Sequence, residues 1–311
     1  MKINKITFYN YKAFYSPSIN DVYTLEIPDG KNLLIYGENG SGKSSIFEGL
    51  KDLFQSSINL SQNFNQNKFS FGKIPAQPEP FVSINFDNDP TEYIYSIDSY
   101  NTNTISYDHI MKSNTSKSLL SYKELLKTHF IKEKEELNLF DLMVGENGII
   151  SNVKNPSGLT ANRSEGTFGF LWSDIKRRAA SNRHSYDYWD LSSFPIIEDF
   201  NIGLERFLDL LGGDINNLLA EFDPNFQLEK FEYTSIQHND VRNVPDRLKN
   251  YKIKPIIKFY NEKIVNHSSF LNEARLTALA ISIYFASLME VPDPPYKLLF
   301  LDDIFIGLDN C

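Results

Sequence analysis

The stretch that decides the fold is Gly37-Glu38-Asn39-Gly40-Ser41-Gly42-Lys43-Ser44. It fits the pattern G-x-x-x-x-G-K-[ST], in which glycines let the backbone curl until successive N–H groups point at phosphate oxygens. An apolar run at 32–36 precedes the loop, and a helical pattern over 44–54 follows it. A buried strand before the loop and a helix after it are the context that this motif requires. The sequence therefore predicts a P-loop nucleotide site.

Each polar position of this loop has an expected role. Lys43 is expected to reach the β- and γ-phosphates and to act in catalysis, and the Ser44 hydroxyl is expected to bind Mg²⁺. The start of the following helix adds its positive dipole end. The predicted cofactors are ATP and Mg²⁺, and the other loop positions expected to contact ATP are Gly37, Asn39, Gly40, Ser41, Gly42 and Ser45.

A phosphate loop also needs a carboxylate, carried at the end of a second buried strand. The apolar run Lys297–Leu301 ends in Asp302 and Asp303. Asp302 is expected to hold Mg²⁺, and Asp303 is expected to position or deprotonate the attacking water. Nearly the whole chain separates Lys43 from Asp302, whereas small P-loop kinases and GTPases place the two elements much closer. The two ends of the chain are therefore predicted to build the site around a large insertion.

The rest of the chain alternates between strand and helix patterns. Alternating or apolar runs predict strands at 2–8, 22–27, 81–86, 93–97, 104–107, 226–234 and 253–260. Helical spacing predicts helices at 122–130, 132–143, 168–180, 196–221 and 272–289, the fourth interrupted by Gly212-Gly213. The predicted organisation is an ATPase half at 1–120, a helical insertion at 121–225 and a second ATPase half at 226–311.

Composition limits the expected cellular location and the expected binding partners. No apolar run is long enough to span a membrane, no signal peptide is present, and the one cysteine is Cys311, so a cytoplasmic protein is expected. The net charge of −9 does not favour nucleic acid. A local basic cluster of Lys176, Arg177, Arg178, Arg183 and His184 is read either as a DNA contact or as a solvated helix face.

At its two ends, roughly 1–50 and 255–311, the chain resembles the ABC-type ATPase heads related to RecF, SMC and Rad50, above all the compact bacterial versions of DNA repair and anti-phage defence. The resemblance rests on Asn10-Tyr11-Lys12-Ala13-Phe14, on Gly37-Glu38-Asn39-Gly40 and on Ile306-Gly307-Leu308-Asp309. It implies that Lys12 approaches the phosphates and that Asp309 belongs to a D-loop. The implied fold class is α/β: a P-loop NTPase with an ABC-ATPase-like head, an N-terminal antiparallel β portion and a compact helical insertion.

The chain departs from this family at several positions. The stretch that corresponds to the ABC signature lacks its two glycines, so Ser268, Ser269 or Asn272 is the expected contact to the γ-phosphate held by a partner subunit. Asn272 is also expected to cap the helix at 272–289, and an ordinary capped core helix is the alternative reading. Tyr122 stands where glutamine is usual, and Asp303 replaces a glutamate, which implies slow hydrolysis. The family's switch histidine would follow Cys311, so either the sequence is truncated, the reading that we favour, or a partner completes the site.

Three functions are open from sequence. The first is a Mg²⁺-dependent ATPase that forms a homodimer around ATP and passes motion to DNA or to an effector protein, in DNA repair or anti-phage defence. The second is a nucleotide-gated scaffold or sensor that binds ATP with little hydrolysis and controls an effector. The third, a small-molecule P-loop kinase, conflicts with the spacing of Lys43 and Asp302. Replacing Asp303 with Ala distinguishes the first two.

Overall fold

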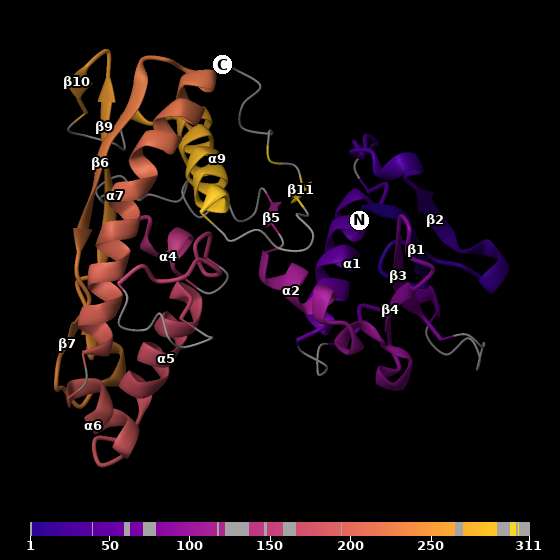
Figure 1. The fold of residues 1–311 in the computed structure, drawn as a ribbon, viewed down its shortest axis with the longest axis horizontal. Helices are drawn as coiled ribbons and strands as arrows, with labels where there is room; N and C mark the ends of the chain where they lie inside the picture. The colour runs from indigo at the N-terminus through magenta and orange to yellow at the C-terminus, as the bar shows by residue number, and fades with distance from the viewer. Residues whose placement is uncertain are drawn as a thin grey trace. The chain divides into compact units, whose positions relative to one another are not determined.

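The computed structural model shows two compact units (Figure 1). Unit 1 comprises Met1–Leu120 with Asp293–Asp302, and unit 2 comprises Ser121–Pro292 with Asp303–Cys311. The structure describes residues 2–38, 40–58, 63–70, 79–116, 118–121, 137–145, 148–157, 166–193, 195–264, 270–290, 299–302 and 304. The division of the chain at 1–120, 121–225 and 226–311 stays a prediction.

Helices and strands follow one another in groups along the chain. The helices are α1 (Lys43–Ser56), α2 (Asp108–Ser116), α4 (Phe140–Met143), α5 (Phe168–Ala180), α6 (Tyr186–Ser193), α7 (Ile196–Phe222) and α9 (Glu273–Met289). The strands are β1 (Ile3–Tyr9), β2 (Tyr23–Glu26), β3 (Phe81–Phe86), β4 (Glu92–Ser96), β5 (Ser118–Ser121), β6 (Phe226–Thr234), β7 (Gln237–His238), β8 (Leu248–Lys249), β9 (Lys252–Phe259), β10 (Glu262–Lys263) and β11 (Leu299–Asp302).

Unit 1 is an antiparallel sheet with α1 packed against it. The strand order is β2-β1-β3-β4, so the predicted N-terminal antiparallel β portion is confirmed. A Cβ on Gly49 of α1 would lie 2.6 Å from Cε1 of Phe8, so only glycine allows this close approach of helix to strand. Phe8, Leu53 and Ile84 are fully buried where the two layers meet. This packing holds the start of α1, and with it the phosphate loop, beside the sheet.

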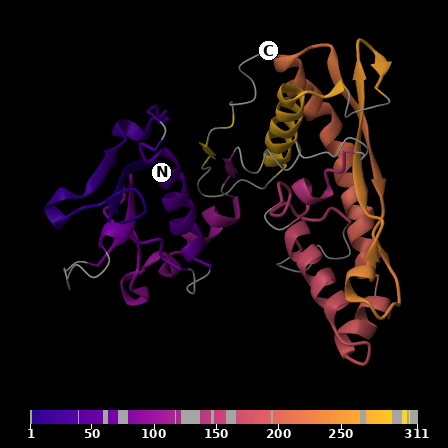
Figure 2. The same cartoon turned by 180° about the vertical axis from the view of Figure 1, so that it is seen from behind.

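Unit 2 pairs long helices with an antiparallel ribbon. Both views show α7 running along β6 and β9, with α9 beside α7 (Figures 1 and 2). Asn216 of α7 donates to the carbonyl of Leu228 at 2.9 Å and accepts from its N–H at 2.8 Å, next to a register shift in β6. The helix is thereby tied to the strand where the ladder is irregular. None of the described helices is both long and apolar enough to cross a bilayer.

Two predicted buried strands are exposed in the structure. Residues 31–38 adopt neither helix nor strand, and Leu34 and Tyr36 are 93% and 98% exposed. Of the strand predicted at 297–301, the described part belongs to β11, which among the described strands pairs only with β5, and Leu299 remains 49% exposed. An apolar run becomes a buried strand only where other strands flank it. Among the described strands none pairs with 32–36, so its prediction as a buried strand is wrong.

Two further predictions need correction. Residues Thr104–Ser106 form a 3-10 helix instead of a strand, with the Asn103 side chain accepting from Ile94 N–H at 2.7 Å. Helix α7 continues without a break through Gly212 and Gly213. Glycine weakens a helix by about 1 kcal/mol relative to alanine, and the buried apolar stripe of α7 outweighs that cost. The helix predicted at 122–130 and the first part of the one predicted at 132–143 lie outside the described residues. In the described remainder of the second, residues 137–139 are not helical and α4 covers only Phe140–Met143.

Candidate nucleotide site

The phosphate loop owes its shape to two glycines. Gly40 and Gly42 have φ angles of 87° and 96°. These lie in the left-handed region, which residues other than glycine adopt only at a cost in free energy. A Cβ on Gly42 would lie 3.3 Å from Cζ of Phe14, so a second constraint acts at this position. Helix α1 begins at the next residue, and among the described residues no side chain caps its start. The positive end of α1 therefore faces the region where phosphate is expected.

Lys43 reaches back across the loop. Its ammonium donates to the carbonyl of Gly37 at 2.8 Å and to that of Glu38 at 3.0 Å. These bonds place the charge inside the curl of the loop. A phosphate that enters this curl meets the Lys43 charge together with the loop N–H groups, which is the arrangement that the motif predicts.

The two ends of the chain meet at Ser44 and Asp302. The Ser44 hydroxyl donates to Oδ1 of Asp302 at 3.4 Å, although the two residues are 258 positions apart. Ser44 lies in the first turn of α1, and Asp302 is the last residue of β11. Magnesium binds oxygen ligands at 2.0–2.1 Å, so neighbouring ligands of an octahedral site lie about 3 Å apart. The hydroxyl and the carboxylate therefore fit one shared Mg²⁺.

Several predicted site residues lie outside the described residues. They are Asn39 of the phosphate loop, Asp303, Tyr122, the signature candidates Ser268 and Ser269, and Ile306–Asp309. Their roles remain predictions. Among the predicted loop residues, Gly37, Gly40, Ser41, Gly42 and Ser45 all belong to the loop and first helical turn, where Ser45 N–H donates to the carbonyl of Gly42 at 2.9 Å.

Lys12 lies against α1, in a short turn after β1. Its side chain forms an ion pair with Glu48, and both side chains are about one-third exposed. The adjacent Tyr11 donates to Oδ2 of the buried Asp52 at 2.6 Å. Burial, together with the negative charge of Asp52, raises the pKa of the Tyr11 hydroxyl, so this phenol stays a donor.

Sequence reasoning missed Glu48, Asp52 and Asn65, which surround this turn. Asn65 donates to the same Oδ2 of Asp52 at 2.8 Å. The available signal was spacing: Glu48 and Asp52 follow Ser44 at intervals of four, so all three lie on one face of α1. Their partners could not be read from the sequence, because those partners come from other elements.

In unit 2, Asn272 caps α9 as predicted. Its Oδ1 accepts from the N–H of Arg275 at 3.0 Å. The Arg275 guanidinium lies 4.5 Å from the ring centroids of both Phe259 and Phe270. The start of this helix is thus held by a cap and by an arginine that contacts two adjacent aromatic rings. A contact of Asn272 with nucleotide stays a prediction.

The three arginines of the predicted basic cluster are paired with aspartates. Arg177 donates to Asp174 at 2.7 Å, Arg178 binds Asp174 and Asp190, and Arg183 donates to Asp240. Although partial burial acts in the opposite direction, the hydrogen bonds from Arg177 and Arg178 lower the pKa of Asp174. This arrangement favours the reading as a solvated, ion-paired face over a DNA contact.

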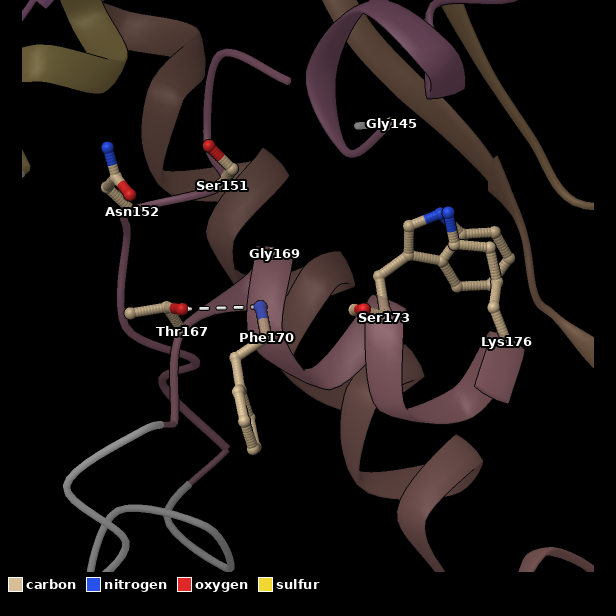
Figure 3. A pocket seen from close by; sticks show the side chains of 9 residues that line it. Gly145, Ser151, Asn152, Thr167, Gly169, Phe170, Ser173 and Lys176 are labelled. Carbon is tan, nitrogen blue, oxygen red and sulfur yellow. Dashed lines mark hydrogen bonds between the residues drawn. The ribbon is translucent and has the colours of Figure 1, made fainter. Parts of the chain in front are cut away.

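One cavity of about 360 Å³ lies at the start of α5 (Figure 3). It is lined by Gly145, Ser151, Asn152, Thr167, Gly169, Phe170, Trp172, Ser173 and Lys176. The first N–H groups of α5 are already satisfied: Phe168 and Gly169 donate to Val153 and Ser151, and Phe170 donates to Thr167 Oγ1. The ammonium of Lys176 lies over the Trp172 ring at 5.8 Å. The helix start and the cation are therefore both engaged within unit 2.

The family comparison agrees with the phosphate loop. The sequence pattern of the AAA domain family matches residues 5–252, most of the chain. The chain therefore belongs to the AAA domain family, a family of ATP-binding ATPase domains. This confirms the predicted class of nucleotide-binding P-loop protein. No curated protein matches the chain in sequence.

Three solved structures illustrate what the chain is similar to. The recombination mediator protein RecF with ATP, from the RecFOR pathway, is 12% identical, with 99% of this chain and 86% of that chain covered and a TM-score of 0.48. The Smc head domain with an extended coiled coil bound to the C-terminal domain of ScpA, from Pyrococcus furiosus, is 12% identical. The match covers 99% of this chain and 83% of that chain, with a TM-score of 0.42. The SmcHead bound to the C-winged helix domain of ScpA is 11% identical. The match covers 100% of this chain and 83% of that chain, with a TM-score of 0.43.

Proposed function

We propose that the chain binds Mg²⁺·ATP on the loop at 37–44 and hydrolyses it. The observation that carries this proposal is the 3.4 Å contact between Ser44 Oγ and Asp302 Oδ1, which brings two magnesium-type ligands beside a glycine-shaped phosphate loop. Bound Mg²⁺ would neutralise phosphate charge and orient the triphosphate. Asp302 and Ser44 would hold the cation.

The other residues supply positioning and charge. Lys43 would exchange its bonds to the carbonyls of Gly37 and Glu38 for phosphate oxygens, and Lys12 would add a second positive charge from the turn after β1. Asp303 would orient the attacking water and accept its proton. A carboxylate one methylene shorter than glutamate reaches less far, so turnover is expected to be slow.

The proposed working form is a homodimer that closes around two ATP molecules. Asn272, Ser268 or Ser269 would reach the γ-phosphate bound by the other subunit. Closing on binding and opening on hydrolysis would pass motion to an effector protein or to DNA, in DNA repair or anti-phage defence. The ion-paired state of Arg177, Arg178 and Arg183 favours an effector protein over DNA at that face.

Steady-state ATP hydrolysis across protein concentration tests this proposal. A rate that rises more than linearly with protein concentration supports the homodimer, and Lys43→Ala is expected to abolish both binding and turnover. A strictly linear rate would remove the dimer from the proposal. Binding without turnover would favour the second candidate.

That second candidate is a nucleotide-gated scaffold that binds ATP, scarcely hydrolyses it and controls an effector. The aspartate at position 303 is the feature that favours it. Asp303→Ala distinguishes the two, because turnover collapses if Asp303 is the catalytic carboxylate and barely changes if the protein is a scaffold. ATP affinity, measured alongside, serves as the control for folding of the site.

A further inference from the structure

The turn after β1 runs antiparallel along α1 and contacts it at three successive levels. Tyr11 donates to Asp52, Lys12 pairs with Glu48, and the Phe14 ring packs against Gly42. Advancing along the turn therefore means moving back along α1 toward the phosphate loop. The lysine lies between an anchor at one end and the loop at the other.

Spacing on α1 defines how far Lys12 is from the magnesium ligands. Ser44, Glu48 and Asp52 are four residues apart and share one helix face. Each step of four residues advances about 6 Å along a helix axis. Glu48 thus holds the Lys12 ammonium about one helical turn from Ser44. A flexible four-carbon side chain can cover that distance by changing rotamers.

The backbone of Lys12 is fixed while its side chain is exchangeable. Its φ angle is 42°, in the left-handed region, and its N–H donates to the carbonyl of Asn65 at 2.9 Å. Asn67 donates to the carbonyl of Lys12. Asp52, buried beneath, is held by Tyr11 and Asn65. By contrast, the Lys12–Glu48 pair is about one-third exposed, so it is individually weak.

We propose that Glu48 is a resting counter-ion that draws Lys12 away from the phosphate loop, and that a bound triphosphate takes the ammonium from it. This inference rests on the proposed ATP site and names a residue that regulates it. Glu48 and the triphosphate compete for one cation, so the carboxylate sets a threshold for ATP affinity. Tyr11 and Asp52 position the turn so that only the side chain of Lys12 moves.

The test is a double-mutant cycle on the full chain, with Mg²⁺ and the β,γ-imido analogue of ATP in a calorimetric titration. Glu48→Gln is expected to tighten binding about two- to fivefold, the scale of a partly exposed ion pair. Lys12→Met is expected to weaken binding, and adding Glu48→Gln to Lys12→Met is expected to change nothing further. Glu26→Gln, which removes an exposed carboxylate on β2 of the same unit, is the matched control and should bind like wild type.

A second measurement needs no nucleotide. The acylation rate of the Lys12 ε-amine, followed by mass spectrometry, is expected to rise in Glu48→Gln, because a paired ammonium gives up its proton less readily. In the Lys12→Arg background, unlike the Lys12→Met background, Glu48→Gln should again tighten ATP binding, because arginine keeps the positive charge. A purely structural role of Lys12 would not require this difference.

The outcomes separate this inference from the proposed function. If the analogue binds neither wild type nor Lys43→Ala, the ATP site itself is wrong. If wild type binds and Lys43→Ala does not, two results overturn the counter-ion role alone. One is a Glu48→Gln affinity equal to wild type, and the other is a gain in affinity that persists in the Lys12→Met background.

Discussion

Ser44 Oγ and Asp302 Oδ1 lie 3.4 Å apart across a sequence separation of 258 residues. The hydroxyl belongs to the first turn of α1, and the carboxylate closes β11, which pairs with β5. Each residue alone is an ordinary surface group. Together they place two oxygen ligands of the proposed Mg²⁺ site next to the phosphate loop.

Replacing Asp302 with Asn should uncouple ATP binding from magnesium. The amide keeps the size of the side chain but loses the negative charge that a hard divalent cation prefers. We expect affinity for Mg²⁺·ATP to fall about tenfold or more, toward the value measured in EDTA. Titration calorimetry with and without Mg²⁺ checks this, with the exposed Asp21→Asn of the same unit as control. An unchanged magnesium dependence would remove Asp302 from the site.

Gly40→Ala and Gly42→Ala should differ in severity. Both place a side chain in the left-handed region at a cost of about 1–2 kcal/mol. Only Gly42 also meets a neighbour, since its Cβ would lie 3.3 Å from Phe14, whereas nothing lies within 4 Å of a Cβ at Gly40. We expect Gly42→Ala to raise amide hydrogen exchange in the first turn of α1 well beyond Gly40→Ala. Equal exchange in the two variants would show that the contact with Phe14 adds no destabilisation at Gly42.

Within α7, two glycines should respond to alanine in opposite directions. Nothing lies within 4 Å of a Cβ at Gly213, so Gly213→Ala should stabilise unit 2 by about 0.5–1 kcal/mol through helix propensity. A Cβ at Gly203 would overlap Oδ1 of Asn155, whose amide donates to Asp199, so Gly203→Ala should destabilise by about 1–3 kcal/mol. Both tryptophans, Trp172 and Trp189, belong to unit 2, so denaturant unfolding followed by tryptophan fluorescence reports this unit. A stabilised Gly203→Ala would contradict the packing.

Unit 2 should lose stability as pH falls below about 6.5. Burial lowers the pKa of His238, an effect that nearby Asp240 opposes, and among the described residues its Nε2 has no hydrogen-bond partner. In the unfolded chain a histidine binds its proton near pH 6.5, before the folded one does, so acid favours unfolding. Above that pH His238 is neutral in both the folded and the unfolded chain, so its contribution to stability does not change with pH. His238→Phe should remove this part of the pH dependence of fluorescence-detected unfolding, whereas an identical profile in the variant would assign it to other groups.

Local signals predicted much of the fold. Helix α5 has the bounds that apolar spacing indicates, and α9 begins after the predicted Asn272 cap. Strands β3 and β6 also match their alternating runs. Each of these signals depends on a few neighbouring residues, since capping, helical spacing and strand alternation are short-range effects.

Burial proved harder to predict than periodicity. The apolar run at 32–36 reads like a buried strand, yet Leu34 and Tyr36 are exposed because no described strand pairs with it. The pair Gly212-Gly213 reads like a break, yet α7 passes through it because its buried stripe outweighs the propensity cost. In both cases a long-range term overrides the local preference.

The sequence by itself determined the phosphate loop, the helix after it and the chemical types of the residues proposed to bind ATP, because these depend on glycine geometry and on motif spacing within one turn. Only the tertiary structure decided which charges meet. Tyr11 finds Asp52 from 41 positions away, Arg183 finds Asp240 from 57, and Lys12 finds Glu48 instead of bulk solvent. A charge in a sequence shows what a side chain can bind, and packing of distant elements selects the partner that it does bind.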